Sequence, residues 1–143
     1  MKVLAGNRII IDTGPLVAFL DKSDQYNYWT GELFSELKPP FLTCEAVLTE
    51  TMFLMQRGGI SSGYLFKMIQ RGSLLVQPIA ANKNVLTTIG TFLDKYQNLP
   101  ASFADACLVW MYENNPNGSI LTLDHDFTIY RTSNDDVVKT IMP

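Results

Sequence analysis

A run of three isoleucines that ends in an acid constrains the fold of this chain more than any other feature. The isoleucines at 9–11 are apolar and β-branched, which is typical of a strand buried on both faces of a parallel sheet. Gly14 breaks that strand, and Pro15 fits the first position of a following helix. Asp12 is therefore expected at the carboxyl end of a central strand, where open α/β sheets bind their ligands. Because a buried carboxylate costs free energy unless a cation or a donor compensates it, Asp12 is a candidate functional residue.

The length and composition of the chain indicate one globular domain over residues 1–143. A hydrophobic content of 47% with 17% charged residues excludes a disordered chain. No segment is apolar for long enough to cross a bilayer, and the N-terminus lacks the ordered regions of a signal peptide. We therefore expect a cytoplasmic protein that has no membrane partner. Cys44 and Cys107 lie in apolar segments with no zinc-binding spacing, which suits a reducing compartment.

The net charge of −3 argues against a protein that coats DNA through a broad basic face. It does not exclude a nuclease. An enzyme that binds metal through carboxylates can be acidic overall and still contact phosphates through the metal and a few basic side chains.

Predicted strands alternate with predicted helices along most of the chain. Strands are expected at 9–11, 41–43, 74–78 and 119–123, and residues 127–131 and 137–141 alternate like a C-terminal hairpin. The helices between them are expected to follow capping side chains: Ser23 or Asp24, Ser61 or Ser62, Asn82, and Ser102. This alternation predicts an α/β fold whose sheet is mostly parallel, with right-handed crossovers.

Four acids stand where their neighbours predict burial or a strand end. Asp12 follows the first strand, and Asp124 follows the strand at 119–123. If these two strands are adjacent in a parallel sheet, both carboxylates lie side by side at one edge. Asp105 lies one turn into the helix that Ser102 caps, and Glu50 lies within an apolar helix predicted at 46–56. The helix that begins at Ser102 can start beyond the same edge of the sheet, which would place Asp105 beside the first two acids. The side chain of Glu50 can approach them from its own helix.

Carboxylates crowded in this way repel one another, which raises their pKa values and destabilises the metal-free fold. Hard divalent cations relieve the repulsion, and Mg²⁺ prefers a few carboxylates together with waters and phosphate oxygens. Paired ions about 4 Å apart activate a water and stabilise the leaving oxygen of a phosphodiester. The chemistry that fits such a site is metal-assisted hydrolysis.

The residues around these acids resemble the four acidic motifs of PIN domains, in the same order and through nearly the whole chain. The matching segments are Ile10-Ile11-Asp12-Thr13-Gly14-Pro15-Leu16, Val47-Leu48-Thr49-Glu50, Ser102-Phe103-Ala104-Asp105-Ala106 and Leu121-Thr122-Leu123-Asp124-His125-Asp126-Phe127. The size is that of a single-domain, VapC-type toxin ribonuclease. The resemblance implies a three-layer sandwich with a central parallel sheet flanked by helices, and Mg²⁺- or Mn²⁺-dependent cleavage of RNA.

The resemblance also implies roles for individual residues. Asp12, Glu50, Asp105 and Asp124 would be catalytic and metal-binding, and Asp126 would be an auxiliary metal-binding acid. The hydroxyls of Thr13 or Thr122 would orient the carboxylates or a bound water. Proteins of this type pair with a small antitoxin that covers the site, and they form homodimers.

Each acid also has a purely structural interpretation. Asp12 can be a helix cap satisfied by backbone donors, and Glu50 can belong to a solvated helix face, since Glu45 is nearby. Asp105 can interact with the helix dipole, and Asp124 and Asp126 can be ordinary turn acids. His125 is better explained as an exposed turn residue than as a ligand, because the sequence has no second histidine.

Two other classes of function compete with a ribonuclease. One is a PIN-like module without catalysis that binds RNA or a protein, although the intact set of four acids argues against it. The other is a different acidic-pocket protein, such as a phosphoacceptor receiver or a haloacid-dehalogenase-like phosphatase. A receiver requires adjacent acids early and a lysine at a late strand end, and the phosphatase requires a DxD after the first strand. Asp12-Thr13-Gly14 offers neither pattern.

Overall fold

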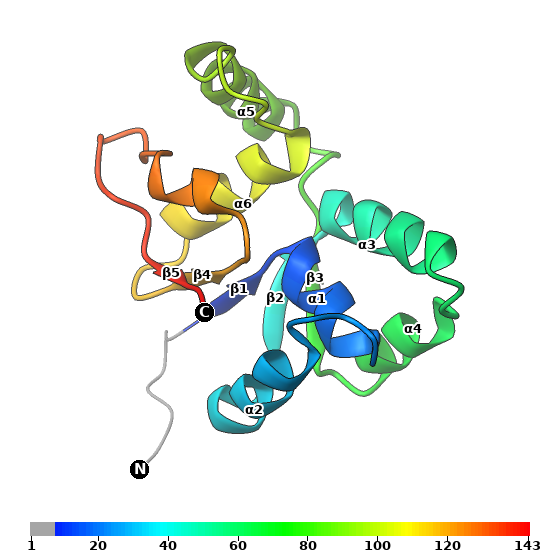
Figure 1. Ribbon diagram of the computed structural model, residues 1–143. Coiled ribbons are helices and arrows are strands. Elements are labelled where there is room, and N and C mark those ends of the chain that lie inside the picture. Colours follow the sequence, from blue (N-terminus) through cyan, green and yellow to red (C-terminus); the bar gives the residue numbers. More distant parts are fainter. Residues whose placement is uncertain (1–7) are drawn as a thin grey trace.

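The computed structural model describes residues 8–143, and its centre is one sheet of five parallel strands (Figure 1). The order of the strands is β3-β2-β1-β4-β5. Their bounds are β1 Ile9–Ile11, β2 Phe41–Cys44, β3 Leu74–Gln77, β4 Ser119–Leu121 and β5 Thr140–Ile141. The isoleucine run is thus the middle strand, as its apolar and β-branched composition predicts.

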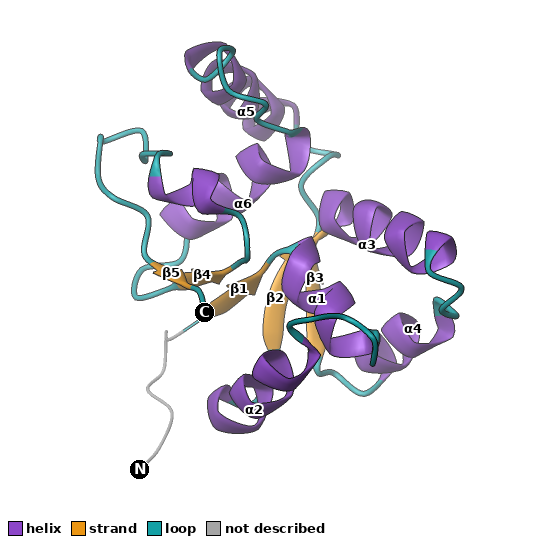
Figure 2. Ribbon diagram, viewed as in Figure 1, coloured by secondary structure: helices purple, strands orange, loops and turns teal. Residues whose placement is uncertain are grey.

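Helices occupy the connections between these strands. Their bounds are α1 Thr13–Leu20, α2 Asn27–Leu37, α3 Glu45–Arg57, α4 Gly63–Gln70, α5 Lys83–Lys95, α6 Phe103–Glu113 and the 3₁₀ helix η1 His125–Thr128. The chain moves from β1 outward to β2 and β3, then returns past β1 to β4 and β5. Because parallel crossovers are right-handed, α1–α4 cover one face of the sheet, and α5, α6 and η1 cover the other (Figures 1 and 2). The result is a three-layer α/β/α arrangement.

The reversal of direction beside β1 creates the ligand-binding crevice of this fold. β1 pairs with β4 on one side and with β2 on the other, and Ile11 lies opposite Leu121. The connections from these strands leave to opposite faces, so a gap opens beyond their carboxyl ends. The first and fourth strands are adjacent, so the condition for bringing Asp12 and Asp124 to one edge is met, and the residues that follow β1 and β4 lie next to one another.

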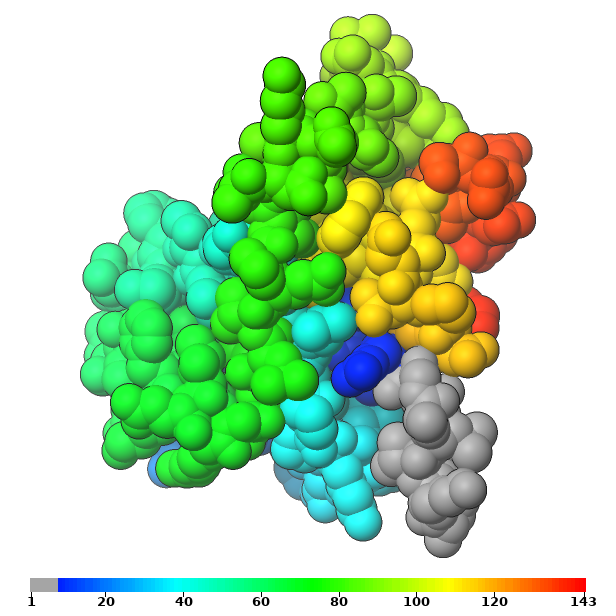
Figure 3. Space-filling view, turned by 180° about the vertical axis from the view of Figure 1, so that it is seen from behind, coloured from blue at the N-terminus to red at the C-terminus, as the bar shows by residue number. Residues whose placement is uncertain are grey.

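The C-terminal segment differs from the predicted hairpin. β5 pairs with β4 in parallel, and the antiparallel pairing within residues 8–143 is a single bridge between Arg131 and Val137. Phe127 and Tyr130 are both fully buried and lie three residues apart, a spacing that fits a 3₁₀ turn and not the alternation of a strand. The segment then lies beside α6 (Figure 3). The N–H of Ser133 donates to Glu113 at 2.8 Å.

The helix caps were predicted with mixed success. Asn82 caps α5 by accepting from the N–H groups of residues 84 and 85, and Ser102 caps α6, as expected. Neither Ser23 nor Asp24 caps α2, which begins at Asn27; Asp24 instead accepts from the N–H of Tyr26 at 2.8 Å in the preceding turn. Because local side-chain bonds serve turns as well as caps, spacing alone did not separate the two.

The core is built from the sheet and the helix faces that cover it. Ile10, Ile11, Ile120 and Leu121 have no exposed surface, so the central strands are buried on both faces. None of the helices in the described part of the chain is long and apolar enough to span a membrane.

We expect Ile11→Ala to lower the free energy of unfolding by about 2–5 kcal/mol, because it removes packed atoms from the centre of the sheet and leaves a cavity. Urea denaturation measures this loss. Ile129→Ala is the matched control: Ile129 is 49% exposed, so its truncation should change stability by less than about 0.5 kcal/mol. Equal effects of the two substitutions would contradict a core centred on β1.

Candidate active site

Asp12 is held rigidly at the end of β1. Its N–H donates to the carbonyl of Leu121 at 3.0 Å, which extends the β1–β4 ladder by one bond. Its carboxylate caps α1, with Oδ1 accepting from the N–H of Thr13 and Oδ2 from the hydroxyl of Thr122, both at 2.7 Å. The residue is 7% exposed. The predicted role of the Thr122 hydroxyl in orienting a carboxylate is therefore seen directly in the geometry.

Asp124 lies across the crevice from Asp12, three residues beyond the end of β4. Its N–H donates to Thr122 Oγ1 at 3.0 Å, so Thr122 contacts both acids. Asp124 Oδ1 accepts from the N–H of Asp126 at 2.9 Å and thereby caps η1. No described residue donates to Oδ2, which leaves this oxygen available to a ligand.

Asp105 is fixed from two directions. It forms a capping box at the start of α6: its N–H donates to Ser102 Oγ at 3.0 Å, and its Oδ2 accepts from the N–H of Ser102 at 3.3 Å. The hydroxyl of Tyr130 also donates to Oδ2, at 2.7 Å. The other oxygen, Oδ1, receives no bond from residues 8–143. Asp105 thus helps to cap α6 from its first turn, where a helix dipole was the structural interpretation, but this role occupies only one carboxylate oxygen.

Glu50 reaches the same place from the other side of the crevice. It lies on α3, and its Oε2 accepts from the hydroxyl of Thr13 at 3.3 Å. Glu45 on the same helix has a different role, because its Oε1 accepts from the N–H of Ile79 at 2.8 Å and ties α3 to the segment after β3. The structure therefore separates the two glutamates that the sequence left in competition.

The four acids line one cleft of about 380 Å³. Its lining residues are Asp12, Thr13, Gly14, Glu50, Pro100, Ser102, Asp105, Leu123 and Asp124. Asp126 and His125 are not among them, so Asp126 contributes its backbone N–H to Asp124 and not a carboxylate to the lining. Within residues 8–143, no three acid, histidine or cysteine side chains are close enough to ligate a single ion in these positions. The acids surround a common space without meeting at one point.

Burial and mutual repulsion make this cleft electrostatically unfavourable for the chain alone. The pKa of Asp12 rises from 3.8 to about 6, chiefly because the carboxylate is removed from water. Bonds from Thr122 and Thr13 oppose the rise, and the charges of Asp105 and Asp124 add to it. Desolvation likewise raises the pKa values of Glu50 and Asp105, each with a further contribution from a neighbouring acid. The cleft is therefore suited to receive positive charge.

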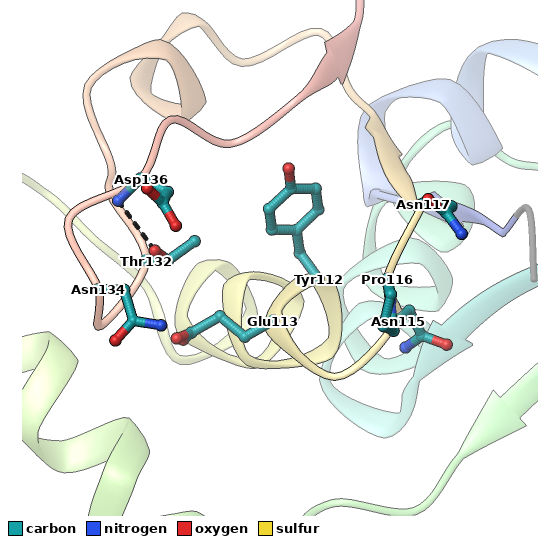
Figure 4. A pocket seen from close by; sticks show the side chains of 8 residues that line it. All are labelled: Tyr112, Glu113, Asn115, Pro116, Asn117, Thr132, Asn134 and Asp136. Carbon is teal, nitrogen blue, oxygen red and sulfur yellow. Dashed lines mark hydrogen bonds between the residues drawn. The ribbon is translucent and has the colours of Figure 1, made fainter.

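A second cavity, of about 260 Å³, lies away from these acids at the amino-terminal end of β4 (Figure 4). Its acidic side chains are Glu113 and Asp136. Glu113 accepts from the N–H and hydroxyl of Ser133 through one oxygen, and the backbone N–H of Asp136 donates to Thr132 Oγ1 at 3.0 Å. This cavity has two acidic side chains, whereas four acids line the cleft.

Comparison with known proteins identifies the architecture. No family model matches the sequence, and no curated protein matches it either. Among solved structures, the fold matches VapC20 of Mycobacterium tuberculosis, described as a toxin that cleaves the sarcin–ricin loop. The TM-score is 0.73 over 85% of this chain and 93% of that chain, at 20% sequence identity. This chain has a PIN-like fold. The three-layer sandwich that the motifs imply is confirmed.

One residue that the sequence did not single out also contacts the acids of this PIN fold. Tyr130 was expected in a hairpin strand, yet its hydroxyl lies 2.7 Å from Asp105 Oδ2. The only local signal was the three-residue spacing from Phe127, which indicates a buried turn but says nothing of an acid 25 positions earlier. A local sequence pattern could not predict this contact, because the two residues are 25 positions apart in the chain.

The pKa of Asp12 predicts a pH-dependent effect of Asp12→Asn on the metal-free protein. Because the folded pKa of about 6 exceeds the ordinary 3.8, folding favours the protonated acid, and the resulting stability is lost as pH rises through 6. That change is on the order of 3 kcal/mol. The unfolding free energy of Asp12→Asn relative to wild type should therefore increase between about pH 4 and pH 8. Denaturant titration in a chelating buffer measures it, and a difference independent of pH would refute the assigned burial.

Proposed function

We propose that this protein is a metal-dependent endoribonuclease that hydrolyses phosphodiester bonds in RNA. The observation that supports it most strongly is the meeting of Asp12, Glu50, Asp105 and Asp124 on one cleft at the carboxyl edge of the sheet. A structural role for these acids accounts for one oxygen of each of the last three, and no residue in the described part of the chain donates to the other. Acids that served the fold alone would cost less free energy as neutral side chains.

The donor set fits a hard divalent cation such as Mg²⁺ or Mn²⁺. Such ions take carboxylate oxygens and keep several sites for water and phosphate oxygens. Among residues 8–143, the oxygens without a donor are Oε1 of Glu50, Oδ1 of Asp105 and Oδ2 of Asp124. Burial, with a smaller contribution from the charges of Asp105 and Asp124, raises the pKa of Asp12, and a cation would favour its charged form. When bound, the cation supplies positive charge that activates a water and stabilises the leaving oxygen.

The residues of the chain prepare the site for this chemistry. Asp12 is fixed by backbone and hydroxyl donors, so its position is preorganised before any ligand arrives. Thr13 donates to Glu50 and thereby holds α3 and α1 against the same cleft. The burial of Asp12 lowers the local dielectric around its carboxylate, which strengthens its interaction with a bound cation.

The structural match suggests a biological setting for this activity. We propose that the protein is the toxin of a toxin–antitoxin pair, with RNA as substrate and a small antitoxin as partner, and that it acts as a homodimer. The support is the fold shared with VapC20, itself described as a toxin that cleaves the sarcin–ricin loop. Asp126, whose backbone N–H donates to Asp124 Oδ1, is proposed as an auxiliary metal-binding acid beside the cleft.

A module that binds RNA or protein without catalysis is the alternative. Such a module would have no use for unshared carboxylate oxygens in the cleft, and the negative charge of the acids would oppose the approach of phosphate. The alternative predicts RNA binding that survives removal of any one acid, which separates it from a nuclease experimentally.

We expect Glu50→Gln, Asp12→Asn and Asp124→Asn to abolish RNA cleavage in Mn²⁺ or Mg²⁺. Loss of an outer partner of a metal site alone costs about 10- to 100-fold, so loss of a proposed ligand should cost more than about 100-fold. The assay uses purified protein with assorted RNAs, including a hairpin with the sarcin–ricin sequence.

Glu45→Gln is the matched control for Glu50→Gln, because it changes the same helix and the same chemical group outside the cleft. It should cleave RNA at the wild-type rate. Equal cleavage by all variants would end the catalytic assignment, and RNA binding without cleavage by wild type would favour the non-catalytic module.

Mn²⁺ should raise the thermal midpoint of the wild-type protein in proportion to the logarithm of its concentration above the dissociation constant, because only the folded state presents the site. The rise should vanish in Asp12→Asn and persist in Glu45→Gln. Differential scanning fluorimetry measures both. A wild-type midpoint that does not respond to millimolar Mn²⁺ would contradict a metal site in this cleft.

A further inference from the structure

We propose that Tyr130 is a positioning residue of the active site, which fixes the carboxylate of Asp105 so that one oxygen faces the cleft. The inference rests on the proposed metal-dependent activity and extends it to a residue outside the four acids. Tyr130 is fully buried, and its hydroxyl donates to Asp105 Oδ2 at 2.7 Å. A short bond from a neutral donor to a carboxylate is among the stronger hydrogen bonds in proteins.

The ring and the hydroxyl of Tyr130 have separate tasks. The ring belongs to an aromatic cluster in which its centroid lies 5.2 Å from Phe92, 5.1 Å from Tyr96 and 5.2 Å from Phe127. Phenylalanine would fill the same space, so packing does not explain the hydroxyl. A buried hydroxyl requires a partner, and Asp105 is the one that the described residues provide.

The two bonds to Oδ2 determine what Asp105 offers to a ligand. Oδ2 accepts from Tyr130 and, more weakly, from the N–H of Ser102 at 3.3 Å, whereas no described residue donates to Oδ1. Within residues 8–143, every fully buried side-chain oxygen has a hydrogen-bond partner, so Oδ1 must be open to solvent. Because Asp105 also lines the cleft, Oδ1 is its single oxygen available to a cation there.

The segment that carries Tyr130 also carries Asp124. Asp124 caps η1, and the N–H of Tyr130 donates to the carbonyl of Asp126 at 3.1 Å at the end of the same turn. One short turn therefore sets the position of Asp124 directly and that of Asp105 through a hydroxyl. Outer partners of this kind orient metal ligands and are commonly worth about 10- to 100-fold in metal affinity.

The test compares Tyr130→Phe with Tyr96→Phe. Both remove one hydroxyl from the same aromatic cluster, but Tyr96 accepts from the N–H of Arg131 at 2.8 Å and contacts no acid of the cleft. Free Mn²⁺ is followed by electron paramagnetic resonance during titration of each metal-free protein. We expect Tyr130→Phe to weaken Mn²⁺ binding by about 10-fold or more and Tyr96→Phe to leave it unchanged.

A double-mutant cycle with Asp105→Asn isolates the pair. If Tyr130 acts through Asp105, then Tyr130→Phe should produce no further loss of Mn²⁺ affinity in the Asp105→Asn background. Equal Mn²⁺ affinity of Tyr130→Phe and wild type would overturn the positioning role alone, as would an equal loss in both tyrosine variants. Absence of Mn²⁺ binding by wild type would overturn this inference together with the proposed function, so the two failures differ in the wild-type titration.

Discussion

The pairing of β1 with β4 is the constraint on which the rest of this structure depends. Three registered residue pairs, extended by the bond from the Asp12 N–H to the Leu121 carbonyl, bring together segments that are far apart in the chain. The pairing sets the reversal point of the sheet, opens the crevice and places Thr122 where its hydroxyl meets Asp12. Without this register the acids after the two strands would face different surroundings.

The same pairing also places carboxylates close together in a partly buried site, which costs electrostatic free energy. Desolvation raises the pKa values of Asp12 and Asp105, and the charges of neighbouring acids raise them further. The chain offsets part of this cost with hydroxyl and backbone donors on selected oxygens, and leaves others unshared. The hydrogen-bond donors hold the four carboxylates in place, but they do not compensate all of the negative charge. The remaining charge connects the structure to the proposed metal-dependent activity.

Several residues here serve the fold and the site together. Asp12 caps α1, Asp105 completes the capping box of α6, and Asp124 caps η1, so three of the four acids begin a helix. Each uses one oxygen to accept from a backbone N–H, which helps to fix the side chain. Glu50 is the exception, because it lies inside α3 and depends on the Thr13 hydroxyl for its orientation.

The sequence by itself determined the central strand, the alternation of strands and helices, the caps Asn82 and Ser102, and the identity of the acids at strand ends, because these depend on local periodicity and backbone chemistry. Tertiary structure alone decided between Glu50 and Glu45, replaced the hairpin with η1, and brought Tyr130 to Asp105. The reason is the range of the interactions. The bond from Thr122 to Asp12 joins residues 110 positions apart, and that from Thr13 to Glu50 joins residues 37 apart. No local pattern records which carboxylate oxygen such a contact occupies and which it leaves free.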